Sequence, residues 1–456
     1  MPAFPPRWLR FLPASIRNRI QDSQNVQKII GNVGWLFFDK VLRMGVGLFV
    51  GVWVARYLGP ERFGIMSYGI AFVGLFSAFG TLGLNGIVVR DLVRNPADKD
   101  ATLGTAFVLQ TLGGLVGTIL ALVSIEYAKP DDEVLKIIVL ILGTAMVFRA
   151  SDIVKYWFES KVQSKVVVWI ENGVFLFMTL VKVFLILNSE SLLAFVYVFL
   201  VESFLVSSWL FYAYVADGQK IRNLRWQYQR ACELLSDSWP LILSGLAVMM
   251  YMRIDQIMLG GMLSSEKVGI YAAAARISEV WYFFPTVIVN SLFPSIVDLK
   301  KRNDPRYLPT IQLLYDYLIS VSLLVALVMT FMSPWVVRSL YGDGYAEAGQ
   351  VLSIQIWAGV FVTMGIARGP WVLSEGLQRY THRYIIIALI VNLVANYVLI
   401  PIYGLVGAAI GSVMAQATTA VIAPCLFKET RPAVKMFATS LNPMRWAKKL
   451  FMGWWA

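Results

Sequence analysis

Two apolar stretches of this sequence, each long enough to cross a lipid bilayer, carry ionisable side chains in their interior. The first run of segment 241–298 contains Arg253 and Asp255. The second run contains Arg276 and Glu279. An ionised group at the centre of a lipid-facing helix costs about 2.5–3.5 kcal/mol. These four side chains are therefore expected to face protein or water, where arginine is suited to forked contacts with phosphate.

The spacing within each pair indicates how far the charges neutralise each other. Arg253 and Asp255 are two residues apart, so they leave a helix in nearly opposite directions. Arg276 and Glu279 are three apart and share a helical face. One member of the first pair therefore needs a partner elsewhere in the chain.

The composition predicts that the whole chain is an all-α integral membrane protein. Of 456 residues, 58% are hydrophobic and 15% charged, and the mean hydropathy is +0.64. A soluble domain could not bury so much apolar surface in one core. About twelve transmembrane helices are expected near 29–56, 63–89, 102–124, 134–157, 166–187, 191–215, 240–262, 269–297, 310–332, 350–373, 384–400 and 404–427.

The distribution of basic residues orients the chain in the membrane. Most lysines and arginines outside the apolar segments fall on the termini and on alternate loops. The opposite loops hold only five, namely Arg62, Lys129, Lys136, Lys267 and Arg338. The positive-inside rule then places both termini in the cytoplasm. The net charge of +12 is explained by this topology and by contact with anionic lipid, so no nucleic-acid partner is expected.

An internal repeat predicts two six-helix bundles. The run Glu61-Arg62-Phe63-Gly64-Ile65 matches Glu266-Lys267-Val268-Gly269-Ile270 at a spacing of 205 residues. Because six spans per copy is an even number, the copies are parallel repeats related by an axis along the membrane normal. The expected parts are an interfacial N-terminal segment 1–28, a bundle 29–215, a cytoplasmic linker 216–238, a second bundle 239–427 and an amphipathic tail 428–456.

Basic residues outnumber acidic residues inside the expected spans. The basic residues are Lys40, Arg43, Arg56, Arg149, Lys155, Lys182, Arg253, Arg276 and Arg368. The acidic residues are Asp39, Asp152, Glu171, Glu202, Asp255 and Glu279. Arg276 corresponds to Ala71 in the first copy of the repeat, so the scaffold recurs without this charge. Binding of an anion is the functional interpretation, and structural ion pairs such as Asp39 with Arg43 are the alternative.

Other residue patterns exclude several kinds of site. Lys182 and Arg368 are expected to extend to opposite membrane interfaces. Cys232 and Cys425 have no metal-ligand spacing, and His382, the only histidine, lies in an inner loop. No nucleotide-binding motif or metal cluster is present in the sequence, so we expect no catalytic residue, metal or cofactor. The chain is not expected to be an enzyme.

Two stretches resemble the polysaccharide-transporter (Wzx-like) flippases of the multidrug, oligosaccharidyl-lipid and polysaccharide exporter superfamily. They are Ala55–Tyr68, with the run Arg-Tyr-Leu-Gly-Pro-Glu-Arg-Phe-Gly, and Arg253–Ile277. The resemblance extends over about residues 28–430. It implies two bundles around a central cavity that opens alternately to the two sides of the bacterial inner membrane. The related lipid II flippases usually have two further spans, for which this sequence has no apolar run.

The resemblance also implies a substrate, an undecaprenyl-pyrophosphate-linked oligosaccharide such as an O-antigen or exopolysaccharide repeat unit. The expected partners are this lipid-linked glycan and membrane lipids, and a polysaccharide polymerase or other assembly protein is left open. A drug exporter of the same fold would need an excess of carboxylates in the spans, whereas the excess here is positive. A membrane-embedded polymerase or ligase would need catalytic groups on a large outer loop, and the longest, 333–349, offers only Arg338, Asp343 and Glu347.

The candidate residues fall into three groups. The substrate-binding candidates are Arg276, Arg253, Arg43, Arg56, Arg149 and Lys40. The candidates for coupling or charge pairing are Asp39, Asp152, Asp255 and Glu279. The polar cavity candidates are Asn85, Asn290 and Gln110, for which packing between helices is the alternative role.

Overall fold

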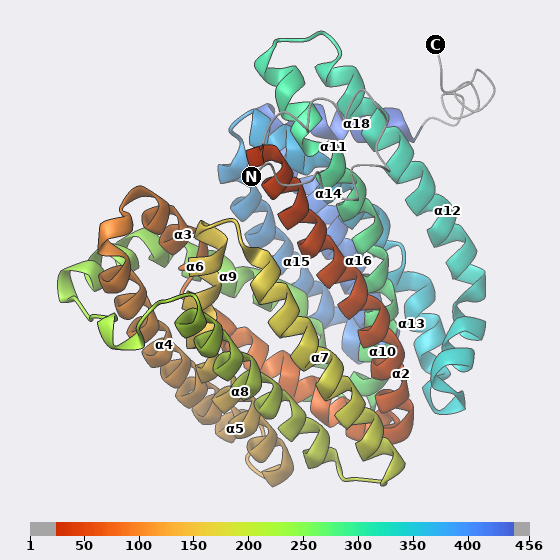
Figure 1. Ribbon diagram of the computed structural model, residues 1–456. Coiled ribbons are helices and arrows are strands. Elements are labelled where there is room, and N and C mark those ends of the chain that lie inside the picture. The colour runs from red at the N-terminus through yellow and green to blue at the C-terminus, as the bar shows by residue number, and fades with distance from the viewer. Residues whose placement is uncertain (1–23, 442–456) are drawn as a thin grey trace.

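The computed structural model describes residues 24–441, and within this range the chain consists of helices joined by short turns and loops and forms no strand (Figure 1). The expectations for residues 1–23 and for the end of the tail from residue 442 lie outside the described residues. The all-α prediction is confirmed. It follows from the requirement that backbone polar groups in lipid hydrogen-bond within their own segment.

The helices divide at the polar connection after Ala216. The first half contains α2 (Gln24–Thr81), α3 (Asn85–Arg94), α4 (Lys99–Ala128), α5 (Glu133–Val147), α6 (Asp152–Ser160), α7 (Ser164–Leu187) and α8 (Leu192–Ala216). The second half contains α9 (Tyr228–Met262), α10 (Ser265–Trp281), α11 (Phe283–Lys301), α12 (Tyr307–Tyr341), α13 (Glu347–Gln355), α14 (Ala358–Ser374), α15 (Gln378–Tyr403), α16 (Leu405–Ala417), α17 (Ala423–Leu426) and α18 (Arg431–Ser440).

Eleven helical segments of the described chain are long and apolar enough to cross a membrane. The first of them contains a kink at Gly59, whose φ of 72° lies outside the helical region. Pro60 follows and has no backbone N–H to continue the hydrogen-bond ladder. The kink divides α2 into two membrane-crossing parts. The twelve spans expected from the hydropathy pattern are therefore confirmed.

Several spans are built from two consecutive helices. The 3-10 turn Phe148–Ser151 joins α5 to α6, and the π-helical turn Thr418–Ile422 joins α16 to α17. In the second half, two further spans are also built from consecutive helices: α10 continues into α11, and α13 continues into α14. Such breaks leave backbone carbonyls without their usual helical partners, and side chains from neighbouring helices can bond to them.

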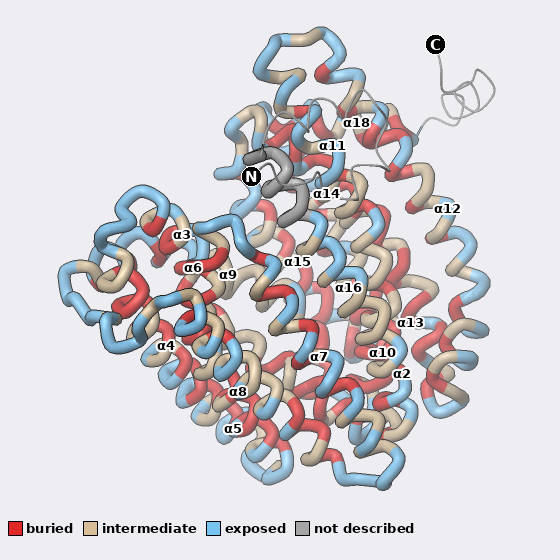
Figure 2. The backbone as a smooth tube through the Cα atoms, viewed as in Figure 1, coloured by how far each residue is buried: buried red, intermediate tan, exposed pale blue. Residues whose placement is uncertain are grey.

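The hydrophobic cores show how the two halves are joined. One core is shared between the halves and includes Phe63 of α2 and Val268 of α10. Figure 2 shows buried segments of α2 and α10 at the end opposite the termini of the described chain, Gln24 and Leu441.

At the other end there are two further cores. The core around Tyr156 belongs mainly to the first half but also contains Ala231 and Leu234 of α9, and the core around Tyr315 belongs to the second half. The halves therefore share one core, and the start of α9 also packs into the first half.

The connection between the halves is held against the first half. The backbone N–H of Arg225 donates to the carbonyl of Asp100, and the N–H of Gln227 donates to Thr105 Oγ1 (3.1 Å). Hydrogen bonds from Trp157 and Lys161 to Asp217 hold the pKa of that carboxyl below its usual value, although burial opposes this shift. Residues 228–238 form the start of α9, so helix extends into the segment expected as linker.

Candidate functional site

Two adjoining cavities lie among the helices of the first half and α10. The first has a volume of about 390 Å³ and is lined by α2, α7, α8 and α10. The second, of about 580 Å³, extends from it toward α5 and α6. Both are lined by Arg43, Phe175, Lys182 and Phe199, so they adjoin, and they combine apolar walls with several charged side chains. The volume is in the range of small-molecule sites.

Most charges in the second cavity are engaged in ion pairs. Arg43 contacts Asp39 at 2.7 Å and Glu171 at 3.4 Å. Lys155 contacts Glu171 and, at 2.8 Å, Asp152. Arg149 lies 3.7 Å from Asp152. This chain of ion pairs joins α2, α6 and α7, and it fits the structural alternative left open for Asp39, Arg43, Arg149 and Asp152.

Arg276 differs from these residues because it lines the first cavity without an ion pair. Among residues 24–441, no carboxylate lies within 4.0 Å of its guanidinium nitrogens. The guanidinium stands over the ring of Phe63, 5.4 Å from the centroid, and reaches α2 beside Gly51. Glu279 lines the same cavity but makes no ion pair with Arg276. Arg276 is a half-buried cation with hydrogen-bonding capacity left for a ligand.

In the two cavities, cations outnumber carboxylates by less than they do over all the expected spans. Five cations line the two cavities: Arg43, Arg149, Lys155, Lys182 and Arg276. Four carboxylates line them too: Asp152, Glu171, Glu202 and Glu279. The free positive charge is therefore concentrated at Arg276 and at Lys182, whose nearest carboxylate oxygen, on Glu202, is 4.0 Å away.

Asp255 lies in a separate, small cavity of about 60 Å³ in the second half. Its carboxylate is 8% exposed and accepts hydrogen bonds from four neutral side chains. The donors are Tyr271, Asn392, Asn396 and Ser412. Three amide oxygens of the same cluster, on Asn392, Asn396 and Gln355, are buried without a partner. Such an arrangement of oxygen atoms around one carboxylate can take up a proton or a small cation.

The remaining predicted residues are not brought together with Arg276. Arg253 is half-buried and lines neither cavity. The side chains of Lys40, Arg56, Asn85 and Asn290 are exposed outside the two cavities. Gln110 is fully buried and donates to Tyr156 Oη and to the carbonyl of Thr81. This geometry fits the alternative role of packing between helices.

The structure corrects two expectations about lysine and arginine positions. Lys182 lines both cavities instead of extending to an interface, and its side chain is 19% exposed. Arg368 is 6% exposed, donates to the carbonyl of Thr419 in the π-helical turn and stands over the ring of Tyr384. Lys182 and Arg368 each have a polar or aromatic partner inside the bundle, so neither side chain needs to extend to the membrane interface.

The fold is that of a multi-pass helical membrane protein, with cavities among its helices that can hold a ligand. The chain belongs to the family described as "Polysaccharide biosynthesis protein", whose model matches residues 29–300. The predicted resemblance to polysaccharide transporters is confirmed by this match. Within the described residues, no group of three or more His, Cys, Asp or Glu side chains is placed to hold a metal ion.

Two curated relatives are similar over different shares of the chain. The "Probable flippase AglR" of Haloferax volcanii is 30% identical over 188 residues, which is 40% of this chain and 39% of AglR. The matched region thus spans about two fifths of that relative's length. The "Capsular polysaccharide biosynthesis protein CapF" of Staphylococcus aureus is 19% identical over 393 residues, covering 85% of this chain and 96% of CapF.

Solved structures share the fold over nearly the whole chain. The lipid II flippase MurJ, in an inward closed conformation, matches with a TM-score of 0.70 and 14% identity, over 90% of this chain and 91% of MurJ. An inward-facing multidrug resistance transporter of the MATE family and MOP superfamily matches with a TM-score of 0.69 and 15% identity, over 88% of this chain and 96% of that structure. At these identities the likeness shows the fold alone.

Proposed function

We propose that this chain is a flippase that moves a polyprenyl-pyrophosphate-linked oligosaccharide from the cytoplasmic to the periplasmic leaflet of a bacterial inner membrane. The substrate is then an undecaprenyl-pyrophosphate-linked repeat unit of an O-antigen or exopolysaccharide. Residues 29–215 and 239–427 act as the two moving bundles, and alternating access exposes the cavity to one leaflet at a time. The name of AglR supports this assignment.

The observation that carries the proposal is the unpaired guanidinium of Arg276 beside Lys182 and Arg43 in one cavity. A pyrophosphate headgroup brings two to three negative charges, and an arginine fork can bind it through two parallel hydrogen bonds. In a space shielded from water this contact is stronger than on a surface. The other cavity cations keep their carboxylates and hold the helices that present Arg276.

Two rival functions have less support from the geometry. A drug exporter for cationic substrates would need a free carboxylate at the centre of the large cavity, but Asp152 and Glu171 are held by Lys155 and Arg43. A polymerase or ligase would need reactive groups on the outer loop. There Glu347 is paired with Lys267 at 2.6 Å.

We propose Asp255 as the group that couples transport to an ion gradient. Asp39 and Asp152 are less suited because lysine or arginine already neutralises them. Asp255 has only neutral partners, and its cavity shares the lining residue Glu279 with the first cavity. Glu279 therefore stands between the anion site and the coupling site. Use of the membrane potential by the anionic substrate is the alternative drive.

The direct test is reconstitution in liposomes with a defined polyprenyl-pyrophosphate glycan. Exposure of the glycan on the far side is scored with an impermeant sugar-modifying enzyme, under an imposed proton gradient, sodium gradient or potential. We expect transport that needs the purified protein. Formation of new glycosidic bonds, with no movement under any gradient, would replace the flippase by a polymerase.

The proposed orientation predicts which loops are accessible from the cytoplasm. Single cysteines at the exposed positions Gln163 and Asn303 should react with an impermeant thiol reagent in inside-out vesicles only. A cysteine at the exposed position Asp131 should react in intact cells, because the charge bias places its loop outside. The background requires Cys232→Ser and Cys425→Ser, since both native cysteines are exposed. The reverse labelling pattern would invert the topology.

A further inference from the structure

The two copies of the repeat meet at a pair of glycines. A Cβ atom at Gly64 of α2 would overlap the carbonyl oxygen of Ser265 and lie 2.9 Å from the backbone nitrogen of Gly269 in α10. A Cβ at Gly269 would overlap the carbonyl oxygen of Pro60 and lie 2.9 Å from the nitrogen of Gly64. The carbonyl that a Cβ at Gly64 would overlap belongs to Ser265, four residues before Gly269. The carbonyl that a Cβ at Gly269 would overlap belongs to Pro60, four residues before Gly64. The contact is thus symmetric, as the repeat axis requires.

At this point α2 and α10 cross backbone to backbone. Only residues without a side chain allow two helices to approach so closely, and hydrophobic burial gives little drive for helix association within lipid. The glycine pair therefore determines how closely the halves meet. We call the contact of Gly64 and Pro60 with Gly269 and Ser265 the glycine seal.

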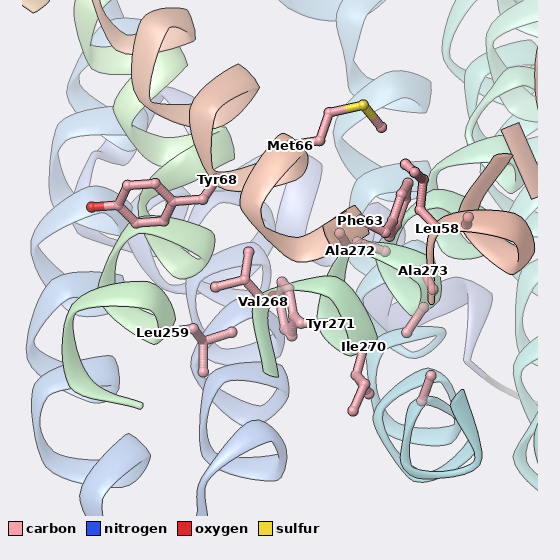
Figure 3. Close-up of a cluster of buried hydrophobic side chains, with 14 of the residues drawn as sticks. Leu58, Phe63, Met66, Tyr68, Leu259, Val268, Ile270, Tyr271, Ala272 and Ala273 are labelled. Atoms are coloured by element: carbon pink, nitrogen blue, oxygen red, sulfur yellow. The ribbon is translucent and has the colours of Figure 1, made fainter. Parts of the chain in front are cut away.

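Small and aromatic side chains surround the glycine seal. Phe63 and Leu58 of α2 lie beside Ala272 and Ala273 of α10 (Figure 3). The hydroxyl of Tyr345, from the second half, donates to the carbonyl of Ala55 in the first at 2.7 Å. All these residues belong to the shared core at the end opposite the termini. The cores around Tyr156 and Tyr315 share no residue, although the first also contains Ala231 and Leu234 of α9.

The seal is in contact with the anion site. Phe63, which precedes Gly64, lies under the guanidinium of Arg276. Met66 lies two residues after Gly64 and lines the first cavity together with Arg276. A phosphate binds to the N–H edge of the guanidinium, and its negative charge weakens the attraction between the cation and the face of the Phe63 ring. Occupation of the cavity therefore weakens a contact that holds the sealed arrangement.

We propose that the glycine seal is the gate of the transport path on the side opposite the termini, and that Phe63 makes its opening respond to an anion at Arg276. The first part depends only on the backbone contact. The second part rests on the proposed function, since it requires a prenyl pyrophosphate or a similar anion in the cavity. Opening separates Gly64 from Gly269 and connects the cavity to the far side.

The gate is tested by labelling a cysteine at Met66, which is 4% exposed in the sealed structure. The variant Met66→Cys, with both native cysteines replaced, is treated with an impermeant maleimide from the side that the Asp131 loop faces. Gly64→Ala and Gly269→Ala should each raise the labelling rate by about tenfold or more. This is the change expected when an open state with a population of a few per cent becomes the main state.

Matched controls are available on α2 and on α9, the helix that precedes α10. Gly45 in α2 and Gly261 in α9 have no atom within 4 Å of an added Cβ, so Gly45→Ala and Gly261→Ala should leave the rate unchanged. Equal rates in the seal variants and these controls would place the gate elsewhere. The amount of each variant in the membrane is measured in parallel to detect misfolding.

The link to the substrate is tested with the glycines intact. A short-chain prenyl pyrophosphate should speed labelling of Met66→Cys several-fold, and the matching prenyl alcohol should not. Phe63→Leu should abolish this response. Phe175→Leu, which removes the ring under Arg43 in the same cavity, should keep it. If the pyrophosphate still speeds labelling in the Phe63→Leu variant, Phe63 does not link the gate to the anion. If labelling does not respond to the pyrophosphate while Phe63 is intact, Phe63 does not link the gate to the anion, and the proposed substrate loses support. The labelling result for the glycine variants is unaffected by this outcome.

Discussion

Arg276→Ala is expected to reduce transport of a prenyl-pyrophosphate glycan by about a hundredfold or more, because a forked charge-assisted contact contributes about 3 kcal/mol. The protein should still accumulate in the membrane. Arg276 makes no ion pair with the described residues, so its removal leaves no buried carboxylate without a partner. The matching position of the first half is Ala71, which is fully buried within a helix of the same repeat. The measurement is the reconstituted transport rate at equal protein content.

Arg276→Lys separates charge from geometry. An ammonium restores the positive charge but cannot form two parallel bonds, so transport should recover only in part. Arg43→Ala is the matched comparison in the same cavity. It leaves Asp39 and Glu171 without one of their cations, and we expect loss of folded protein as well as activity. Normal transport by Arg276→Ala would move the anion site toward Lys182 and Arg149.

The number and type of elements could be predicted because lipid restricts the chain to continuous helices. Hydropathy and length were then sufficient for all twelve spans. The helical start of α9 was not predicted, since residues 228–238 are polar overall. Its Ala231 and Leu234 are three residues apart and pack in the core of the first half. That spacing is the local signal by which the amphipathic turn could have been found.

Whether the candidate residues bind a substrate stays a prediction, and the structure shows only which of them lie together. Arg276 and Arg43 line one cavity, as their burial cost suggested, but Arg253 on α9 does not. The periodicity of a sequence shows on which face of its own helix a residue lies. It does not show which helix packs against that face, because this depends on how the helices rotate and pack. Lys182 was missed for the same reason. It lies in the last turns of α7, where both an interface and a cavity are within reach of its side chain.

The surroundings of Asp255 show another limit of sequence reasoning. The spacing from Arg253 correctly indicated that one of the two residues needs a different partner. The partners are neutral and come from three other helices, so no search for opposite charge would find them. Asn392 and Asn396 are four residues apart on one face of α15 and are both buried. Two buried amides on one face of an apolar helix were the available signal.

Asp255→Asn is expected to abolish the response of transport to an imposed proton or sodium gradient, with at least about a tenfold loss of rate if the gradient supplies 1.4 kcal/mol or more. The asparagine keeps the size of the side chain and can still accept a hydrogen bond from Tyr271 or Ser412, so the helices should remain packed. What it loses is the charge that takes up a proton or cation. Transport is measured with and without each gradient.

Asp152→Asn is the control for a carboxylate of the large cavity. Asp152 is held by Lys155 and Arg149, so its neutralisation should lower folded protein but leave the remaining transport sensitive to the gradient. Binding of a prenyl pyrophosphate to Asp255→Asn should persist, because Arg276 lies in the other cavity. If Asp255→Asn keeps a full gradient response, the cluster around Asp255 is a structural hydrogen-bond network. The membrane potential acting on the anionic substrate then becomes the drive to be tested.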